Sequence, residues 1–201
     1  DAKKFYKQCV LENRKFGIFK NENYYGHHRR DYSPETLLPL LSTVEESAQE
    51  VHYINKFQIV HFTGHTSTGQ NYRNIKQVWM HANALFALRI DVPVPVGIFK
   101  KYPAKLSKEG VLISQIPENC IPLNQYADLH SGKNSILYAL LRLAEQVSPF
   151  GTFSKDLSTH DFLVQMKGNR LKCYLGNYTA FHMNHHPVQK NRTVNTRIIK
   201  Q

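Results

Sequence analysis

The stretch that decides the fold is Gly151-Thr-Phe-Ser-Lys-Asp-Leu-Ser-Thr-His-Asp-Phe-Leu-Val164. Before it, apolar residues recur with helical spacing from Ser135 to Phe150, and a proline and a glycine end that pattern. After it, a β-rich run from Arg170 to Leu175 follows across Lys167-Gly168-Asn169, which predicts a hairpin. We therefore expect a helix, then a polar loop that carries acidic residues, then a hairpin.

Two acids of this loop, Asp156 and Asp161, stand five residues apart. A loop that supports phosphoryl transfer needs a carboxylate beside the acceptor hydroxyl and a metal ligand a few residues further on. The simpler interpretation is a polar connection between a helix and a hairpin, with Asp in turn positions. This stretch alone favours the simpler interpretation.

The composition indicates a folded globular protein. The chain has 201 residues, of which 41% are hydrophobic and 11% aromatic, enough for one large domain or two small lobes with a shared core. It shows no signal-peptide pattern at residue 1 and no apolar run near the ~20 residues of a membrane span. Cys9, Cys120 and Cys173 are too far apart for a metal motif or a disulfide framework, which favours a reducing cytosol.

The net charge of +11 gathers at the two ends of the chain. Residues 1–30 hold eight Lys and Arg against three acids, and residues 182–201 hold four against none. Basic ends attract polyanions such as nucleic acid, anionic lipid headgroups or a phosphorylated glycolipid. The alternative is that these charges serve only solubility.

The rest of the chain predicts strands around one helix, followed by a more helical part. The expected elements are an amphipathic helix early in 1–23, a strand at 15–20, a loop at 21–31, a helix from Ser33-Pro34-Glu35 to Leu41, strands at 50–54 and 57–62 joined by Asn55-Lys56, a helix at 73–88, an extended link at 90–96, strands at 96–100 and 110–116, and a short helix at 123–129. The helix at 135–147 has an apolar surface wide enough to be largely buried.

Several segments, in this order, resemble the bacterial lipopolysaccharide core kinases, the Kdo and heptose kinase-like proteins. Ala84 to Val96 resembles their helix followed by L-x-x-x-G-I/V-P-x-P-x-P, and Val111 to Pro117 resembles their hinge strand. Gly151 to Val164 and Leu171 to Phe181 are similar to their catalytic loop and metal-binding segment. The likeness covers roughly residues 50 to 197.

The resemblance implies an α+β, bilobal protein-kinase-like fold with a small β-rich N-lobe and a short helical C-lobe. We place a basic N-terminal extension at 1–31, the N-lobe at 32–116, and the C-lobe with its basic tail at 117–201. Family members transfer the γ-phosphate of ATP to a sugar hydroxyl of lipid A–core. The implied location is the cytoplasm, peripherally on the inner membrane.

Phosphoryl transfer needs a Lys on the phosphates, a Glu that holds this Lys, carboxylates on Mg²⁺ and an Asp at the acceptor hydroxyl. Carried over by position, Asp156 matches the catalytic Asp, Asp161 the metal-binding Asn, Asn177 the metal-binding Asp, His61 the phosphate Lys, and Ser114, Gln115 and Ile116 the nucleotide-binding hinge. One carboxylate and one amide thus remain for Mg²⁺. This exchange of residue types represents either a retained metal site or drift after activity was lost, and the other departures favour drift.

Those departures remove the phosphate clamp. His61 replaces the Lys, Val78 the helix Glu and Ser154 the usual His, and no glycine-rich loop precedes Glu50. A full positive charge at ~4 Å is worth about 4 kcal/mol at an effective dielectric of ~20, before desolvation. Histidine is mostly neutral near pH 7 unless a phosphate raises its pKa, so it replaces that charge only in part.

Three functional hypotheses follow. The first is a kinase-like domain with degraded motifs, a pseudokinase-type module that binds anionic glycolipid, the membrane surface or a protein partner. The second is an active ATP-dependent sugar kinase that uses Asp156 as base and holds Mg²⁺ with Asp161 and Asn177. The third is a nucleic-acid-binding module, suggested by the charge and by aromatic residues such as Tyr24 and Tyr25 among His and Arg.

The histidines and the single tryptophan have simpler explanations than a functional site. His185 and His186 are adjacent and no cysteine is spaced to join them, which argues against a structural zinc site. With His182, His27 and His28, they are expected to line a polar surface that becomes cationic at mildly acidic pH. Trp79 lies on the apolar face of its helix, where we expect core packing.

Overall fold

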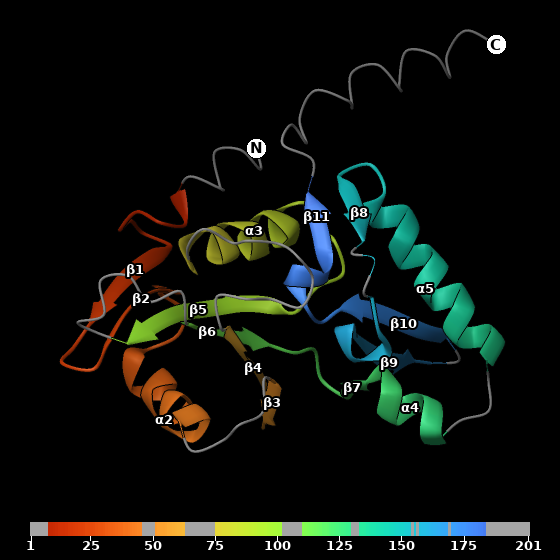
Figure 1. The fold of residues 1–201 in the computed structure, drawn as a ribbon, viewed down its shortest axis with the longest axis horizontal. Helices are drawn as coiled ribbons and strands as arrows, with labels where there is room; N and C mark the ends of the chain where they lie inside the picture. The colour runs from red at the N-terminus through yellow and green to blue at the C-terminus, as the bar shows by residue number, and fades with distance from the viewer. Residues whose placement is uncertain are drawn as a thin grey trace, which may run out of the picture.

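The computed structural model describes residues 8–45, 51–62, 75–101, 110–129, 133–153, 155, 157–168 and 170–183. Its main feature is a six-stranded sheet in the order β1-β2-β5-β6-β4-β3, in which every pairing is antiparallel (Figure 1). The strands are β1 (Phe16–Lys20), β2 (Tyr24–Arg29), β3 (Val51–Ile54), β4 (Phe57–Phe62), β5 (Val94–Lys101) and β6 (Gly110–Gln115). The mixed α+β architecture predicted from the sequence is confirmed.

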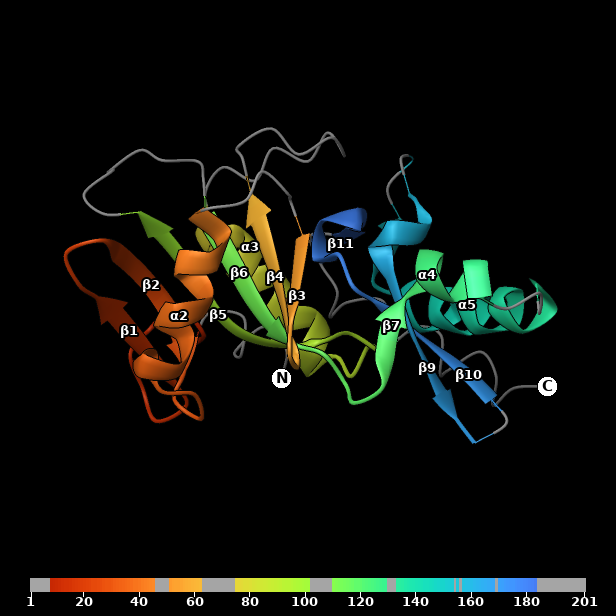
Figure 2. The ribbon, with the colours of Figure 1, turned by 90° about the horizontal axis from the view of Figure 1, so that it is seen from below.

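Helices cover both faces of this sheet (Figures 1 and 2). α2 (Pro34–Glu45) packs Leu37 and Leu41 against one face, in a buried cluster that includes Ile59 of β4. α3 (Ile75–Ala87) packs Trp79 against the other face, in a cluster that includes Val60 of β4. Successive residues of a strand point to opposite faces, so β4 contributes alternately to the two clusters.

The predicted start of α2 and both predicted hairpins are confirmed. Ser33 precedes α2, and its hydroxyl accepts a hydrogen bond from the Thr36 N–H at 3.4 Å, although the helix runs beyond Leu41 to Glu45. The hairpin β3–β4 turns at Asn55, whose φ of 52° lies in the left-handed region that Asn tolerates. The hairpin β9–β10 turns at Gly168 with a φ of 61°, where glycine has no steric penalty.

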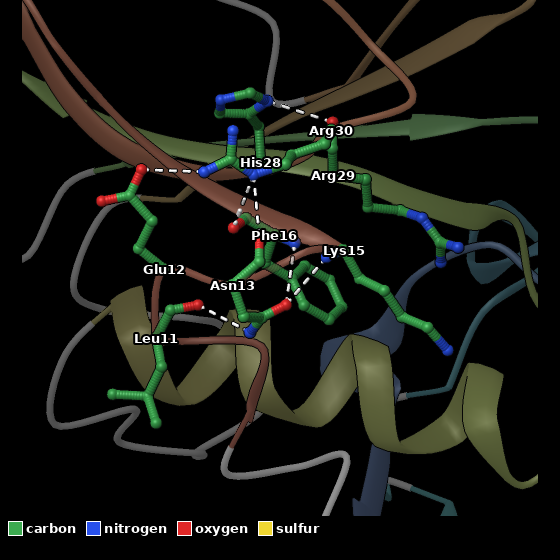
Figure 3. Close-up of polar contacts among 8 residues, drawn as sticks. All are labelled: Leu11, Glu12, Asn13, Lys15, Phe16, His28, Arg29 and Arg30. Carbon is green, nitrogen blue, oxygen red and sulfur yellow. Dashed lines mark hydrogen bonds and ion pairs between the residues drawn. The ribbon is translucent and has the colours of Figure 1, made fainter.

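The prediction of a loop over 21–31 is wrong, because Tyr24–Arg29 forms β2 between β1 and β5. The adjacent histidines His27 and His28 made this segment look like a polar loop in the sequence. In the structure both are only 7% exposed and fill buried positions of the strand. Residues 16–29, which we placed in a basic extension, therefore belong to the large sheet. Beyond β2, the Arg30 guanidinium donates to the Asn13 carbonyl at 2.8 Å and pairs with Glu12 at 2.8 Å, which ties the chain before β1 to the end of β2 (Figure 3).

The second half of the chain lies beside the large sheet (Figure 2). It contains β7 (Cys120–Pro122), α4 (Leu123–Leu129), α5 (Lys133–Val147), β8 (Gly151–Phe153), β9 (Phe162–Lys167), β10 (Arg170–Leu175) and β11 (Phe181–Met183). The strands form a sheet β10-β9-β7 and a pair β11-β8. The predicted position of α5 is confirmed, but the expectation that it is largely buried is wrong, because Leu137, Tyr138 and Leu141 are more than half exposed.

Asp91, in the link between α3 and β5, joins the large sheet to this second half. Its carboxylate pairs with Lys172 of β10 at 2.6 Å and accepts from the Gln146 side chain of α5 at 2.8 Å. Its carbonyl accepts from the Leu175 N–H at 2.9 Å. Burial lowers the pKa of Lys172, but the hydrogen bond and charge of Asp91 outweigh burial and raise that pKa above its ordinary value.

We expect the substitution Asp91→Ala to lower the free energy of unfolding by about 1–2 kcal/mol, because it removes a partly exposed ion pair together with a hydrogen bond to Gln146. The matched control is Asp31→Ala, since Asp31 pairs with Arg29 at 3.9 Å and is 78% exposed. Urea denaturation of both variants measures the difference. Equal, small losses in the two variants would show that Asp91 does not join the halves.

The buried His27 predicts a loss of stability in mild acid. Burial, with smaller contributions from Lys76 and His28, lowers the pKa of His27 to about 4 from the 6.5 of an exposed histidine. Between pH 6.5 and 4, His27 is therefore protonated in the unfolded chain but not in the folded chain. Its contribution to the free energy of unfolding is fully present above pH 6.5 and is lost as the pH drops towards 4. The loss approaches about 1.4 kcal/mol per pH unit.

We expect the substitution His27→Phe to reduce this pH dependence without abolishing it, because burial also lowers the pKa of His81 to about 4, whereas the exposed control His160→Phe leaves the pH dependence unchanged. Urea denaturation between pH 7 and pH 4 measures the slope. A slope identical in wild type and His27→Phe would contradict the assignment.

Candidate functional site

Asp161 lies where the loop after β8 enters β9. It ends the short 3-10 turn Thr159–Asp161 and is only 8% exposed. The Ser158 N–H and hydroxyl both donate to its Oδ2, at 2.8 and 3.2 Å. A buried carboxylate needs such donors, because an unsatisfied buried charge is costly. Ser158 therefore fixes the orientation of this acid.

Asn177 donates to the other carboxylate oxygen. Its Nδ2 lies 2.8 Å from Asp161 Oδ1, and the backbone N–H groups of Gly176 and Asn177 donate to the Asp161 carbonyl at 2.8 and 3.0 Å. The hairpin register explains the contact, because Leu175 pairs with Phe162 and so brings the end of β10 beside the start of β9. We call these two residues the Asp161–Asn177 pair.

In this structure the pair does not present two oxygen atoms to a common cation. Two residues that share a cation must both direct oxygen atoms towards it. Here the amide contacts the carboxylate through an N–H, so the residues face each other as donor and acceptor. Among the described residues, no group of three or more His, Cys, Asp or Glu is arranged to hold a metal ion.

The other acid of the loop, Asp156, lies outside the described residues, as does Ser154. The structure therefore does not place the expected catalytic carboxylate. It does describe the hydrogen bond between Asp161 and Asn177, the two positions expected to hold the metal.

His61 lies on the opposite face of the sheet from the Asp161–Asn177 pair. It alternates with Val60 along β4 and so shares the side of Ile59, which faces α2. The pair lies near Gln58 on the other side, since a methyl group built on Gly176 would be 3.5 Å from the Gln58 side-chain nitrogen. The structure therefore does not bring His61 to the acidic residues.

The position of the helix Glu is apolar and buried. Val78 of α3 is 2% exposed and belongs to the same buried cluster as Val60 of β4. Hydrophobic packing thus occupies the interface between β4 and α3 at this point.

The three expected hinge residues are already engaged with protein groups. The Ser114 hydroxyl is fully buried, 3.3 Å from the Tyr178 hydroxyl, which donates to the Pro93 carbonyl at 2.6 Å. Gln115 accepts a short hydrogen bond from the Tyr32 hydroxyl, and the Ile116 N–H donates to the Lys56 carbonyl at 2.9 Å. β6 is also paired on both sides, so its backbone groups are used in the sheet.

Sequence reasoning missed the buried Gln58. Its side chain is 1% exposed and its Nε2 donates to the Tyr53 hydroxyl at 3.3 Å, while its Oε1 has no hydrogen-bond partner among the described residues. An unsatisfied buried acceptor costs about 1–3 kcal/mol. The available signal was a single amide within the apolar run Phe57-Gln-Ile-Val-His-Phe62.

Together, Gln58, Ser114, Tyr178 and the Asp161–Asn177 pair form a polar cluster between the large sheet and the second half of the chain.

The histidine prediction is wrong at the positions that the structure describes in β2. His27 and His28 are buried, and the low pKa of His27 keeps it neutral in mild acid. His185 and His186 lie outside the described residues. The prediction for Trp79 is confirmed, since it is fully buried and donates to the Cys9 carbonyl at 2.7 Å.

No protein-family model, curated protein or solved structure gives a significant match to this chain. Within the described part of the chain, no helix is both long and apolar enough to cross a membrane.

The Asp161–Asn177 pair predicts a specific response to substitution. Asn177→Asp replaces the donated N–H with a second carboxylate, 2.8 Å from the first. We expect a loss of about 2–4 kcal/mol in the free energy of unfolding in metal-free buffer, because a charge-assisted hydrogen bond becomes a like-charge contact.

Millimolar Mg²⁺ should recover part of this loss in Asn177→Asp and leave the wild type unchanged, since only the variant presents two carboxylates to the ion. Thermal denaturation with and without Mg²⁺ measures both effects, with the exposed Asn23→Asp as control. Equal stabilisation of wild type and variant by Mg²⁺ would mean that the native pair already binds the ion.

Proposed function

We propose that this chain is a kinase-like domain of the lipopolysaccharide core kinase type whose catalytic motifs are degraded, and that it acts as a binding or regulatory module. The observation that carries the proposal is the Asp161–Asn177 pair. The two positions expected to hold the metal lie side by side, yet they contact each other through an N–H and so do not direct two oxygen atoms at a shared cation in this arrangement.

The order and pairing of the elements support the kinase-like part of the proposal. A kinase carries its phosphate Lys on a strand, its Glu on the following helix and its metal ligands in the catalytic loop and beyond it. β4, α3, β6, the loop after β8 and the segment after β10 follow in that order. β4 also pairs with β6, so the strand of the phosphate-binding position lies next to the hinge strand. The bilobal arrangement is part of this proposal.

The chemistry of the residues supports the loss of efficient phosphotransfer. On the α3 side of β4, Gln58 and Val60 are uncharged, and Val78 replaces the acid that would hold a Lys. The missing charge is worth about 4 kcal/mol before desolvation. The residues present therefore do not fit the Mg²⁺–ATP clamp of the family, and no catalytic step follows from them.

The charge of +11 supports an anionic partner for such a module. Anionic headgroups attract basic segments with about 1 kcal/mol for each Lys or Arg near the surface. We therefore propose an anionic glycolipid of the lipid A–core class, met at the cytoplasmic side of the inner membrane, as the ligand. Salt weakens the binding of basic segments to nucleic acid as well as to this glycolipid, so salt dependence alone does not separate the two ligands. Vesicle sedimentation and nucleic-acid binding must therefore be compared directly.

Incubation with labelled ATP, Mg²⁺ and dephosphorylated core glycolipid tests the loss of activity. We expect no phosphate transfer above the background without protein, and no rise in the melting temperature with Mg²⁺–ATP, because a bound ligand must stabilise the native state. Transfer that disappears in Asp156→Ala but persists in the control Asp31→Ala would contradict the proposal.

Sedimentation with vesicles tests the proposed ligand. We expect binding to vesicles that contain the phosphorylated glycolipid, weaker binding to neutral vesicles, and loss of binding as salt rises. Tighter, sequence-selective binding to a nucleic acid would instead favour the nucleic-acid-binding hypothesis.

A further inference from the structure

α5 exposes an apolar surface that nothing in the described part of the chain covers. Leu137, Tyr138 and Leu141 are 56%, 69% and 51% exposed. The opposite side of the helix is buried through Ala139, Leu143 and Val147, and it packs on β10. Figures 1 and 2 both place α5 at the outer edge of the molecule, on the side away from β1 and β2.

The exposed surface is a stripe with polar residues at its ends. At 100° per residue, one helix face carries positions i, i+3, i+4, i+7, i+8 and i+11. In α5 these are Asn134, Leu137, Tyr138, Leu141, Arg142 and Glu145, and all six are exposed. Leu137 and Leu141 form one edge of the stripe, while Tyr138 and Arg142 form the other. We call these six residues the α5 stripe.

The α5 stripe is complementary to itself in the antiparallel direction. When two copies pack about a two-fold axis near the midpoint of the helix, each edge meets the same edge of the other copy. Leu137 then lies against Leu141 of the partner subunit, and Tyr138 lies against Arg142 of the partner subunit. Asn134 lies against Glu145 of the partner subunit, within reach of a hydrogen bond.

Each of these contacts is favourable. Two leucine pairs bury apolar surface, and an Arg guanidinium over a Tyr ring gains a cation–π interaction. Tyr and Arg are also the residue types that dominate the binding energy of interfaces. A parallel pairing, in contrast, would place the Tyr138–Arg142 edge against the leucine edge of the partner subunit, which leaves Arg142 beside leucine instead of beside a Tyr ring.

We propose that the α5 stripe is a homodimer interface, in which α5 packs antiparallel to α5 of a second copy of this chain. This inference does not depend on the proposed function. A single helix pair gives a small interface, so the dimer forms at micromolar concentrations rather than as an obligate assembly.

Sedimentation velocity of the full chain over about 1–200 µM tests the proposal, a range that covers dissociation constants typical of weak dimers. The wild type should convert from monomer to dimer as concentration rises. Leu137→Glu and Leu141→Lys should each raise the dissociation constant at least tenfold, because each places a charge against a leucine. The control Leu11→Lys, at a leucine that is 59% exposed elsewhere, should dimerise like the wild type.

An equimolar mixture of Leu137→Glu and Leu141→Lys provides the decisive comparison. In a mixed dimer the new Glu faces the new Lys at one contact, and the other contact remains leucine against leucine. We expect the mixture to associate more tightly than either variant alone, with circular dichroism confirming that both are folded. A wild type that stays monomeric throughout, or a mixture that associates no better than its components, would overturn the proposal.

Discussion

The hydrogen bond from Asn177 to Asp161 is the constraint on which the functional account depends. It satisfies a buried carboxylate with neutral donors, and it joins the start of β9 to the chain after β10. The same contact uses the two positions from which a kinase-like site would bind its metal. While this contact is made, the two side chains do not present two oxygen atoms to Mg²⁺.

The two faces of β4 carry different side chains beside the site. The side that faces α3 carries Val60 in an apolar cluster with Val78, where a kinase would have a charged contact. His61 lies on the α2 side of the sheet, away from the Asp161–Asn177 pair. Beside Val60 on that side, β4 contributes the amide of Gln58, whose Oε1 has no hydrogen-bond partner among the described residues.

Much of the fold follows from local sequence signals, while contacts depend on the packing. Turn residues such as Asn55 and Gly168 have a direct conformational reason, so both hairpins could be predicted. β2 was missed because its two adjacent histidines look like loop residues until burial is known. The exposure of α5 was missed because helical periodicity reports an apolar surface but not whether anything covers it. The meeting of Asp161 with Asn177 could be inferred, but not which amide atom faces the acid.

We infer that Asp161 and Asn177 stay hydrogen-bonded to each other and do not separate to bind Mg²⁺. The most direct test is the NMR signal of the Asn177 side-chain NH₂ group, followed as Mg²⁺–ATP is added. We expect two inequivalent protons, one protected from exchange with solvent by its bond to Asp161, with chemical shifts that stay constant up to millimolar Mg²⁺–ATP. Saturable shifts of these protons, with loss of that protection, would show that the pair opens to bind the metal and would contradict the account.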